Sequence, residues 1–193
     1  MACRVIVYSV VLTTGLFLQP LRTAARPAII FGSNPEAREC YDSAERAVDS
    51  GGTTPFALQA CTQAIEQGGL ETQDRAATFV NRGILRVALE DYEGAFLDYG
   101  AAMDLYPRYG AIYVNRGNIF FLRKSYDSAI AEYAKALEAE MSEYQVAHLN
   151  RGMAHEQLGH YKSAEADYRR ALELAPGWSL AESKLARVLT KMN

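Results

Sequence analysis

The sequence of 193 residues lacks several features that mark particular classes of protein. It has no long run of lysine and arginine, and its formal net charge is −3. Nucleic-acid-binding proteins draw much of their affinity from the neutralisation of phosphates, and anionic lipid likewise attracts polybasic segments. We therefore expect neither nucleic acid nor a membrane surface among the partners of the mature chain.

Motifs for catalysis are missing as well. The sequence has no Gly-rich phosphate loop, no nucleophile elbow and no paired-carboxylate motif. It also has no Cys-x-x-Cys spacing, which in redox enzymes lowers the pKa of a thiol. The sequence therefore predicts a protein that is not an enzyme and that needs no cofactor.

Hydrophobic runs long enough to cross a membrane are missing too. The apolar stretch at residues 5–18 has 14 residues, whereas a transmembrane helix needs about 20. It follows Arg4 and precedes a proline and small residues that end at Ala25, an order typical of a signal peptide. We interpret residues 1–25 as a cleaved signal peptide and residues 26–34 as a linker; a retained membrane anchor is the alternative. Cleavage implies a secreted or periplasmic protein.

An internal repeat with a period of 34 or 35 residues is present in the rest of the chain. The tripeptide Asn-Arg-Gly occurs three times. Twelve residues after its glycine comes an alanine, and a tyrosine lies three residues before and four residues after that alanine. The glycine, alanine and two tyrosines are Gly83, Ala95, Tyr92 and Tyr99, then Gly117, Ala129, Tyr126 and Tyr133, then Gly152, Ala164, Tyr161 and Tyr168. Such self-similarity is the signature of stacked structural repeats.

Each repeat contains two helical stretches, which in the first copy are residues 76–89 and 92–105. Asp91 and, in the second copy, Ser125 stand where the second helix begins, and their side-chain oxygens suit an N-cap. The glycine and the alanine are small where two antiparallel helices cross closely, and we expect the aromatic residues around them to fill the space between repeats. One hairpin cannot bury its apolar face alone, so the repeats must stack.

These repeats resemble the tetratricopeptide repeat family, whose pattern is an aromatic residue, a leucine-glycine pair, an aromatic residue, alanine, an aromatic residue and proline. The matching residues include Phe79, Gly83, Ala95, Tyr99 and Pro107, then Tyr113, Gly117, Phe120, Ala129 and Tyr133, then Gly152, Ala164, Tyr168 and Pro176. Arginine replaces the leucine in all three copies, as Arg82, Arg116 and Arg151, and Met141 replaces one proline. Because each copy also has an acid at one equivalent position, Asp98, Glu132 or Asp167, we predict a ladder of arginine–carboxylate pairs between helices.

The resemblance implies an all-α protein, a right-handed α-solenoid of stacked helical hairpins with a C-terminal capping helix. We place the three full repeats at residues 76–109, 110–144 and 145–178, and the capping helix at residues 179–193. A degenerate hairpin at residues 35–71, with helices expected at 36–48 and 55–67, precedes them.

Two cysteines remain after removal of the leader, Cys40 and Cys61, one on each helix of the degenerate hairpin. An even number of cysteines in an exported chain favours a disulfide between them, and two separate buried thiols are the alternative. The three histidines are His148, His155 and His160. We expect no metal site there, because the first two lie seven residues apart and helical metal sites favour spacings of three or four.

By the same resemblance, ligands bind on the concave side of the stack, which the first helix of each repeat lines. The residues expected to point inward are Val80, Ile84 and Val87, then Val114, Asn118 and Phe121, then Leu149 and Met153; Asn81, Asn115 and Asn150 run along them as a ladder. This ladder either bonds a peptide backbone or bridges neighbouring helices. Family members that clamp a C-terminal carboxylate surround such asparagines with lysine or arginine, whereas Ala77, Ala111 and Val146 stand here, so we do not expect that mode of recognition.

The sequence thus predicts a non-catalytic interaction module or adaptor that binds a peptide or protein segment in a largely apolar groove. Three alternatives stay open. The chain is a structural envelope protein that self-associates, or its own residues 26–35 cover the groove, or it is an exported thiol-dependent enzyme that uses Cys40 and Cys61.

Overall fold

The structure is a computed structural model that describes residues 34–50 and 52–193. These residues form nine α-helices. The helices are α1 (Pro35–Ser50), α2 (Ala57–Gln67), α3 (Thr72–Ala88), α4 (Tyr92–Leu105), α5 (Gly110–Leu122), α6 (Tyr126–Glu138), α7 (Tyr144–Gln157), α8 (Tyr161–Leu174) and α9 (Ser179–Met192). The all-α class is therefore confirmed.

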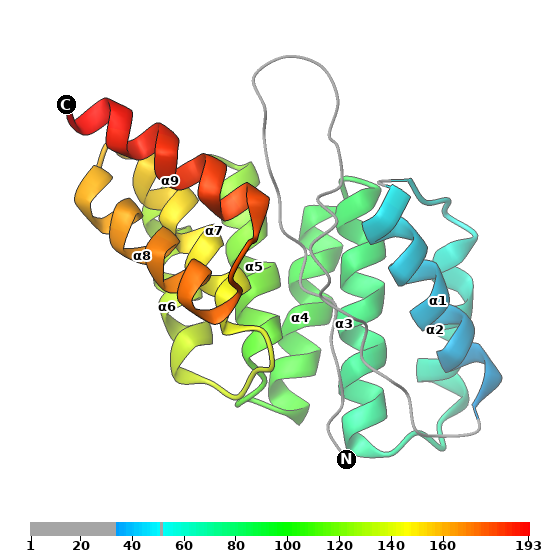
Figure 1. Ribbon diagram of the computed structural model, residues 1–193. Helices are drawn as coiled ribbons and strands as arrows, with labels where there is room; N and C mark the ends of the chain where they lie inside the picture. Colours follow the sequence, from blue (N-terminus) through cyan, green and yellow to red (C-terminus); the bar gives the residue numbers. More distant parts are fainter. Residues whose placement is uncertain (1–33, 51) are drawn as a thin grey trace.

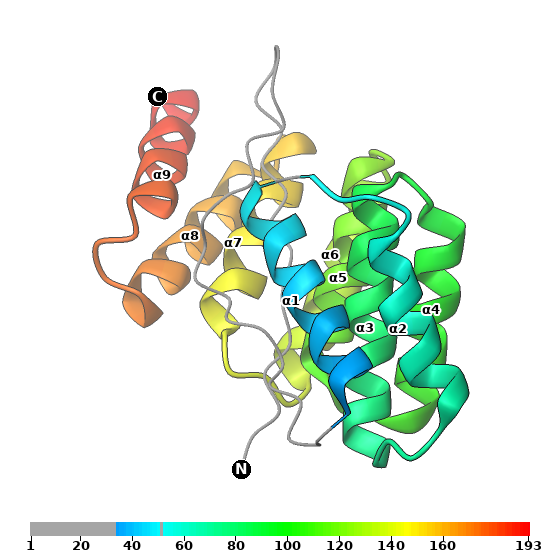
Figure 2. The ribbon, with the colours of Figure 1, turned by 90° about the vertical axis from the view of Figure 1, so that its right-hand side faces the viewer.

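The helices are arranged as a row of stacked antiparallel hairpins. Helices α1 and α2 form one end of the row and α8 and α9 the other, as Figures 1 and 2 show. The hairpins are α1–α2, α3–α4, α5–α6 and α7–α8, and each one packs against the next, with α9 resting on α8. This is the solenoid of helical hairpins, closed by a single helix, that the repeat predicts.

Several helix ends fall where the sequence places them. Helix α4 has the predicted bounds, and α9 begins at the predicted residue and ends at Met192, one residue before the predicted end. Helix α3, by contrast, begins at Thr72, four residues before the predicted start. Gly68 and Gly69 both have positive φ and end α2. The acidic Asp74 then lies in the first turn of α3, where a negative charge complements the helix dipole. Residues 72–75 therefore join the helix.

The crossing of the two helices in each full repeat depends on the repeated glycine and tyrosine. A Cβ atom on Gly117 would lie 2.5 Å from Cε1 of Tyr133, and Tyr133 is fully buried. Gly83 and Gly152 stand in the same relation to Tyr99 and Tyr168. The prediction that the glycine is small where the two helices cross closely is confirmed in all three repeats. The aromatic ring that it meets belongs to the same repeat.

One of the two predicted N-caps is confirmed. Oδ1 of Asp91 accepts a hydrogen bond of 2.9 Å from the backbone N–H of Gly94. Ser125 occupies the N-cap position of α6, but its side chain makes no capping hydrogen bond, so that part of the prediction is wrong. Backbone bonds from Lys124 and Ser125 to the carbonyls of α5 close this turn instead.

The predicted leader lies outside the described residues, as does the linker up to residue 33. Its cleavage and the export that it implies stay predictions. Among the helices of residues 34–50 and 52–193, none is long and apolar enough to cross a bilayer.

Candidate functional site

The residues that the sequence analysis assigns to the concave groove lie on α3, α5 and α7. All of them are buried, each less than a tenth exposed, and the apolar ones belong to one continuous core. They are Val80, Asn81, Ile84, Val87, Val114, Asn115, Asn118, Phe121, Leu149, Asn150 and Met153. In the structure these side chains are not exposed to solvent. Their contact with a partner stays a prediction.

Hydrogen bonds between asparagines of different helices account for part of this burial. Nδ2 of Asn150 on α7 donates a hydrogen bond of 3.0 Å to Oδ1 of Asn118 on α5. The same oxygen accepts a bond of 2.8 Å from the hydroxyl of Tyr133 on α6. Burial raises the pKa of Tyr133 well above its usual value, so this hydroxyl stays protonated and can donate. For Asn150, the alternative in which an asparagine bridges neighbouring helices is the one observed.

Asn81 on α3 differs from these bridging residues. Its side chain is completely buried, yet neither Oδ1 nor Nδ2 has a hydrogen-bond partner in the described part of the chain. Nδ2 of Asn118 is also without a partner there. A buried amide without a partner costs about 1–3 kcal/mol, and such a group calls for a specific reason. On the inner side of α3 and α5, these two amides are therefore buried polar groups that lack a hydrogen-bond partner among the described residues.

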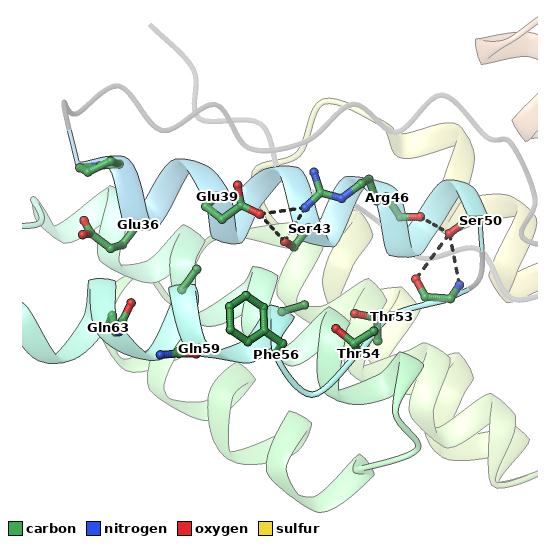
Figure 3. Close-up of a pocket in the computed structure, with 14 residues that line it drawn as sticks. Glu36, Glu39, Ser43, Arg46, Ser50, Thr53, Thr54, Phe56, Gln59 and Gln63 are labelled. Atoms are coloured by element: carbon green, nitrogen blue, oxygen red, sulfur yellow. Dashed lines mark hydrogen bonds and ion pairs between the residues drawn. The ribbon is translucent and has the colours of Figure 1, made fainter.

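A second feature, which sequence reasoning missed, is a hollow of about 570 Å³ on the first hairpin (Figure 3). Its lining residues all fall between Pro35 and Gln63, on α1, on α2 and in the turn that joins them. Phe56, in that turn, is 79% exposed, and Glu39, Ser43 and Arg46 lie across from it on α1. Because α3 to α9 contribute no lining residue, the hollow opens on the side of the hairpin that α3 leaves uncovered.

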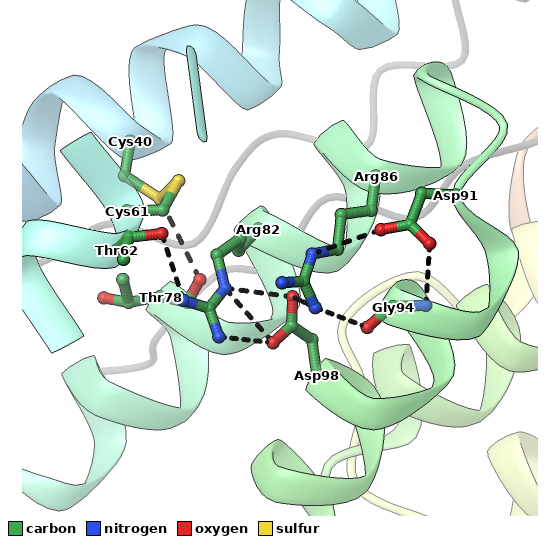
Figure 4. A network of polar contacts seen from close by, with 9 residues as sticks. All are labelled: Cys40, Cys61, Thr62, Thr78, Arg82, Arg86, Asp91, Gly94 and Asp98. Carbon is green, nitrogen blue, oxygen red and sulfur yellow. Dashed lines mark hydrogen bonds and ion pairs between the residues drawn. A yellow bond between two sulfur atoms is a disulfide. The ribbon is translucent and has the colours of Figure 1, made fainter. Parts of the chain in front are cut away.

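The two helices of this hairpin are joined by a disulfide between Cys40 and Cys61, whose Cα atoms lie 4.6 Å apart. Beside it, the hydroxyl of Thr62 accepts a hydrogen bond of 3.2 Å from Nη1 of Arg82 on α3. Figure 4 shows that the same arginine also donates hydrogen bonds to Asp98 on α4. The first hairpin is thus tied internally by a covalent bond and tied to the first full repeat by a polar one.

The predicted arginine–carboxylate ladder is confirmed in every full repeat. Nη2 of Arg82 lies 2.7 Å from Asp98, Nε of Arg116 lies 3.4 Å from Glu132, and Nη2 of Arg151 lies 2.7 Å from Asp167. The three carboxylates are buried. Buried charges persist only where they are paired, so each arginine that departs from the family pattern is matched by an acid.

A buried carboxylate that the sequence analysis did not single out holds the capping helix. Glu156 at the end of α7 accepts a hydrogen bond of 2.7 Å from Arg187 and one of 3.1 Å from Lys191, both on α9. The hydroxyl of Tyr168 donates a third, of 2.9 Å. Burial alone would raise the pKa of Glu156, but these hydrogen bonds outweigh it and lower the pKa. Nearby, burial and the charge of Arg187 lower the pKa of Lys184 to about 8.

Asp167 is subject to the same two opposing effects, burial and hydrogen bonding, and its contribution to stability is sensitive to acid. Burial alone would raise the pKa of Asp167, but hydrogen bonds from His148 and Arg151 outweigh it and lower the pKa. A carboxyl with a lowered folded-state pKa adds stability above its unfolded value of about 4 and loses it as pH falls through the folded value. We expect the free energy of unfolding to fall below pH about 4 and Asp167→Asn to flatten that decline, measured by urea unfolding at successive pH values. Parallel curves for wild type and variant would contradict this assignment.

Two of the three histidines lie close to neighbouring ionisable side chains. His148 bonds Asp167 at 2.9 Å, and burial lowers the pKa of His155, which favours its neutral form. Within the described residues no group of three or more His, Cys, Asp or Glu side chains is placed to hold a metal ion.

The geometry defines a class of protein, a scaffold of stacked helical hairpins. Models of the tetratricopeptide repeat family match residues 80–144 and 146–177, and the chain belongs to this family. No curated protein matches the sequence.

Solved structures give the same fold. The TPR domain of OM64 from Arabidopsis is 26% identical with a TM-score of 0.56, over 61% of this chain and 97% of that domain. The first TPR domain of Spaghetti (RPAP3), bound to the HSP90 peptide SRMEEVD, is 25% identical with a TM-score of 0.58, over 62% and 94% of the two chains. YrrB, a TPR protein with an unusual peptide-binding site, is 24% identical with a TM-score of 0.61, over 70% and 68%.

Proposed function

We propose that the chain is a non-catalytic interaction module that binds a peptide or protein segment along the inner side of α3 and α5. The observation that carries the proposal is the buried, unpartnered amide of Asn81, with the unpartnered Nδ2 of Asn118. A segment with free backbone N–H and C=O groups supplies the partners that these amides lack. The TPR domain of Spaghetti, whose structure contains a bound peptide, supports this class of function.

The partner should be largely apolar. Val80 and Ile84 flank Asn81 on α3, and Val114 lies on α5. The SRMEEVD peptide bound by Spaghetti carries three acidic residues, whereas the inward positions of this chain hold Ala77 and Ala111 instead of lysine or arginine. Because these residues are buried in the free chain, a bound segment has to displace the parts of the chain that cover them. An amphipathic helix or an extended apolar segment fits this chemistry.

The test is a phage-displayed library of random peptides selected on the full chain, followed by affinity measurements on the selected peptides. We expect Asn81→Leu to weaken their binding about tenfold, because one hydrogen-bonded amide is worth about 1.4 kcal/mol. We also expect the same variant to unfold at equal or higher urea concentration than wild type, since it removes an unpaired buried amide.

Gln157→Leu is the matched control, an amide-to-leucine change at an exposed residue near the end of α7. It should leave peptide affinity unchanged. Equal binding by wild type and Asn81→Leu would refute the site, and so would peptides whose binding is lost only in Phe56→Asp, because these would bind in the hollow of the first hairpin.

A further inference from the structure

The two ends of the row of hairpins are built differently. Each hairpin from α3–α4 onward rests on the one before it, and α9 covers the last. At the other end, no helix of the described residues covers the hollow between α1 and α2, and Phe56 stands exposed at its edge. Proline and alanine side chains, Pro35, Ala57 and Ala60, are among the lining residues. Most of the other lining residues are polar, as the outer face of a terminal repeat requires. The exposed phenylalanine beside the hollow is the exception, and it indicates a contact surface.

Helix α9 carries a partly exposed apolar stripe. Ala181 and Val188 are buried, and α9 packs mainly against α8. Leu189 and Met192 are 36% and 38% exposed, and with the half-buried Leu185 they form an i, i+4, i+7 row. Side chains at these spacings lie on one face of a helix, as the apolar anchors of a docked helix do.

The charges of the two ends are also complementary. Helix α1 contains five acidic and two basic residues, a net charge of −3. Glu36, Glu39 and Arg46 line the hollow, and Arg46 bonds Glu39 at 2.9 Å. Helix α9 contains three basic residues and one acidic residue, a net charge of +2. Arg187 and Lys191 each retain more than two fifths of their side-chain exposure despite bonding Glu156. Opposite charge steers two surfaces together and disfavours the meeting of two like ends.

We propose that α9 of one copy docks in the hollow between α1 and α2 of a second copy. Phe56 contacts the Leu189–Met192 stripe, while the net negative charge of α1, with Glu36 at the hollow, meets the basic side of α9. The two contacting surfaces are different parts of the chain, so the association is head to tail, and each added copy leaves one hollow and one α9 free. Copies of the chain therefore form short rows at high concentration.

The test is sedimentation and light scattering of the full chain over a range of concentrations. The mass of the wild type should rise with concentration. Phe56→Asp blocks the hollow and Leu189→Asp blocks the stripe, and each should weaken association about tenfold, as expected when a central apolar contact is lost. Circular dichroism of both variants, whose substituted side chains are exposed, verifies that the helices remain.

A mixture of the two variants distinguishes the head-to-tail association from other modes of self-association. Phe56→Asp keeps an intact α9 and Leu189→Asp keeps an intact hollow, so together they should form a 1:1 pair that grows no further. Leu97→Asp is the matched control, because Leu97 is 74% exposed on α4, away from both ends, and should associate like wild type. A monomeric wild type, association that neither blocked variant weakens, or a mixture that fails to pair would each overturn the proposal.

Discussion

Replacing Gly117 by valine is expected to lower the free energy of unfolding by about 3 kcal/mol or more. The first added carbon would lie 2.5 Å from Cε1 and 2.8 Å from Cδ1 of Tyr133. The ring has no room to withdraw, since it is fully buried and its hydroxyl is held by Asn118 at 2.8 Å. Relief therefore requires α5 and α6 to separate, which opens the core of the second repeat.

The measurement is urea unfolding followed by circular dichroism. Gly100→Ala is the matched control, because Gly100 lies within α4 and a Cβ there would have nothing within 4 Å. This change should raise the free energy of unfolding by about 0.5–1 kcal/mol, since alanine favours a helix over glycine. Equal midpoints for Gly117→Val and wild type would show that the helix crossing tolerates the extra volume.

The contact between Gly117 and Tyr133 was predictable because it depends on local spacing. Two antiparallel helices joined by a short turn bring a residue of the first opposite a fixed position of the second, and the same spacing occurs in three repeats. The arginine–carboxylate ladder followed for the same reason, since Arg82 and Asp98 lie 16 residues apart, as do Arg151 and Asp167. Periodicity therefore predicts contacts within one repeat well.

Contacts that depend on more than one repeat were harder to predict. The inward position of Asn118 follows from its register, but its bond to Asn150 depends on how closely α5 and α7 approach. The sequence pattern places Val80 and Ile84 on one face of α3, yet it does not tell how completely that face is covered. For this reason the apolar groove stays a prediction, although the residues assigned to it are buried.

The hollow of the first hairpin depends on a connection that has no counterpart in the full repeats. Phe56 follows Thr53, Thr54 and Pro55 in the turn between α1 and α2, and its exposure is set by the path of that turn. The available signal was an isolated aromatic residue directly before a helix in a polar, proline-containing segment. The ion pairs of Glu156 could not be predicted from the repeat for a different reason. Its partners Arg187 and Lys191 lie on the capping helix, outside the repeat.

Removing the carboxylate of Asp98 is expected to cost about 3–5 kcal/mol of folding free energy, the usual effect of breaking a buried ion pair from one side. Asp98 is 2% exposed and bonds Arg82 through Nη2 at 2.7 Å and through Nε at 3.1 Å. Nη1 of Arg86 lies 3.0 Å from its other oxygen. In Asp98→Ala two largely buried guanidinium groups would lose their shared anion and repel each other.

Urea unfolding of Asp98→Ala beside Glu173→Ala provides the comparison. Glu173 also pairs with an arginine, Arg170 at 2.6 Å, but both side chains are more than half exposed. Its loss should change the free energy of unfolding by no more than about 0.5 kcal/mol. Because Arg82 also reaches Thr62 on α2, the Asp98 variant should loosen the junction between the first hairpin and the first repeat, seen as faster amide exchange in α2 and α3. If the two variants unfold alike, solvent or another group already neutralises the arginines, and the carboxylate is not what holds this junction.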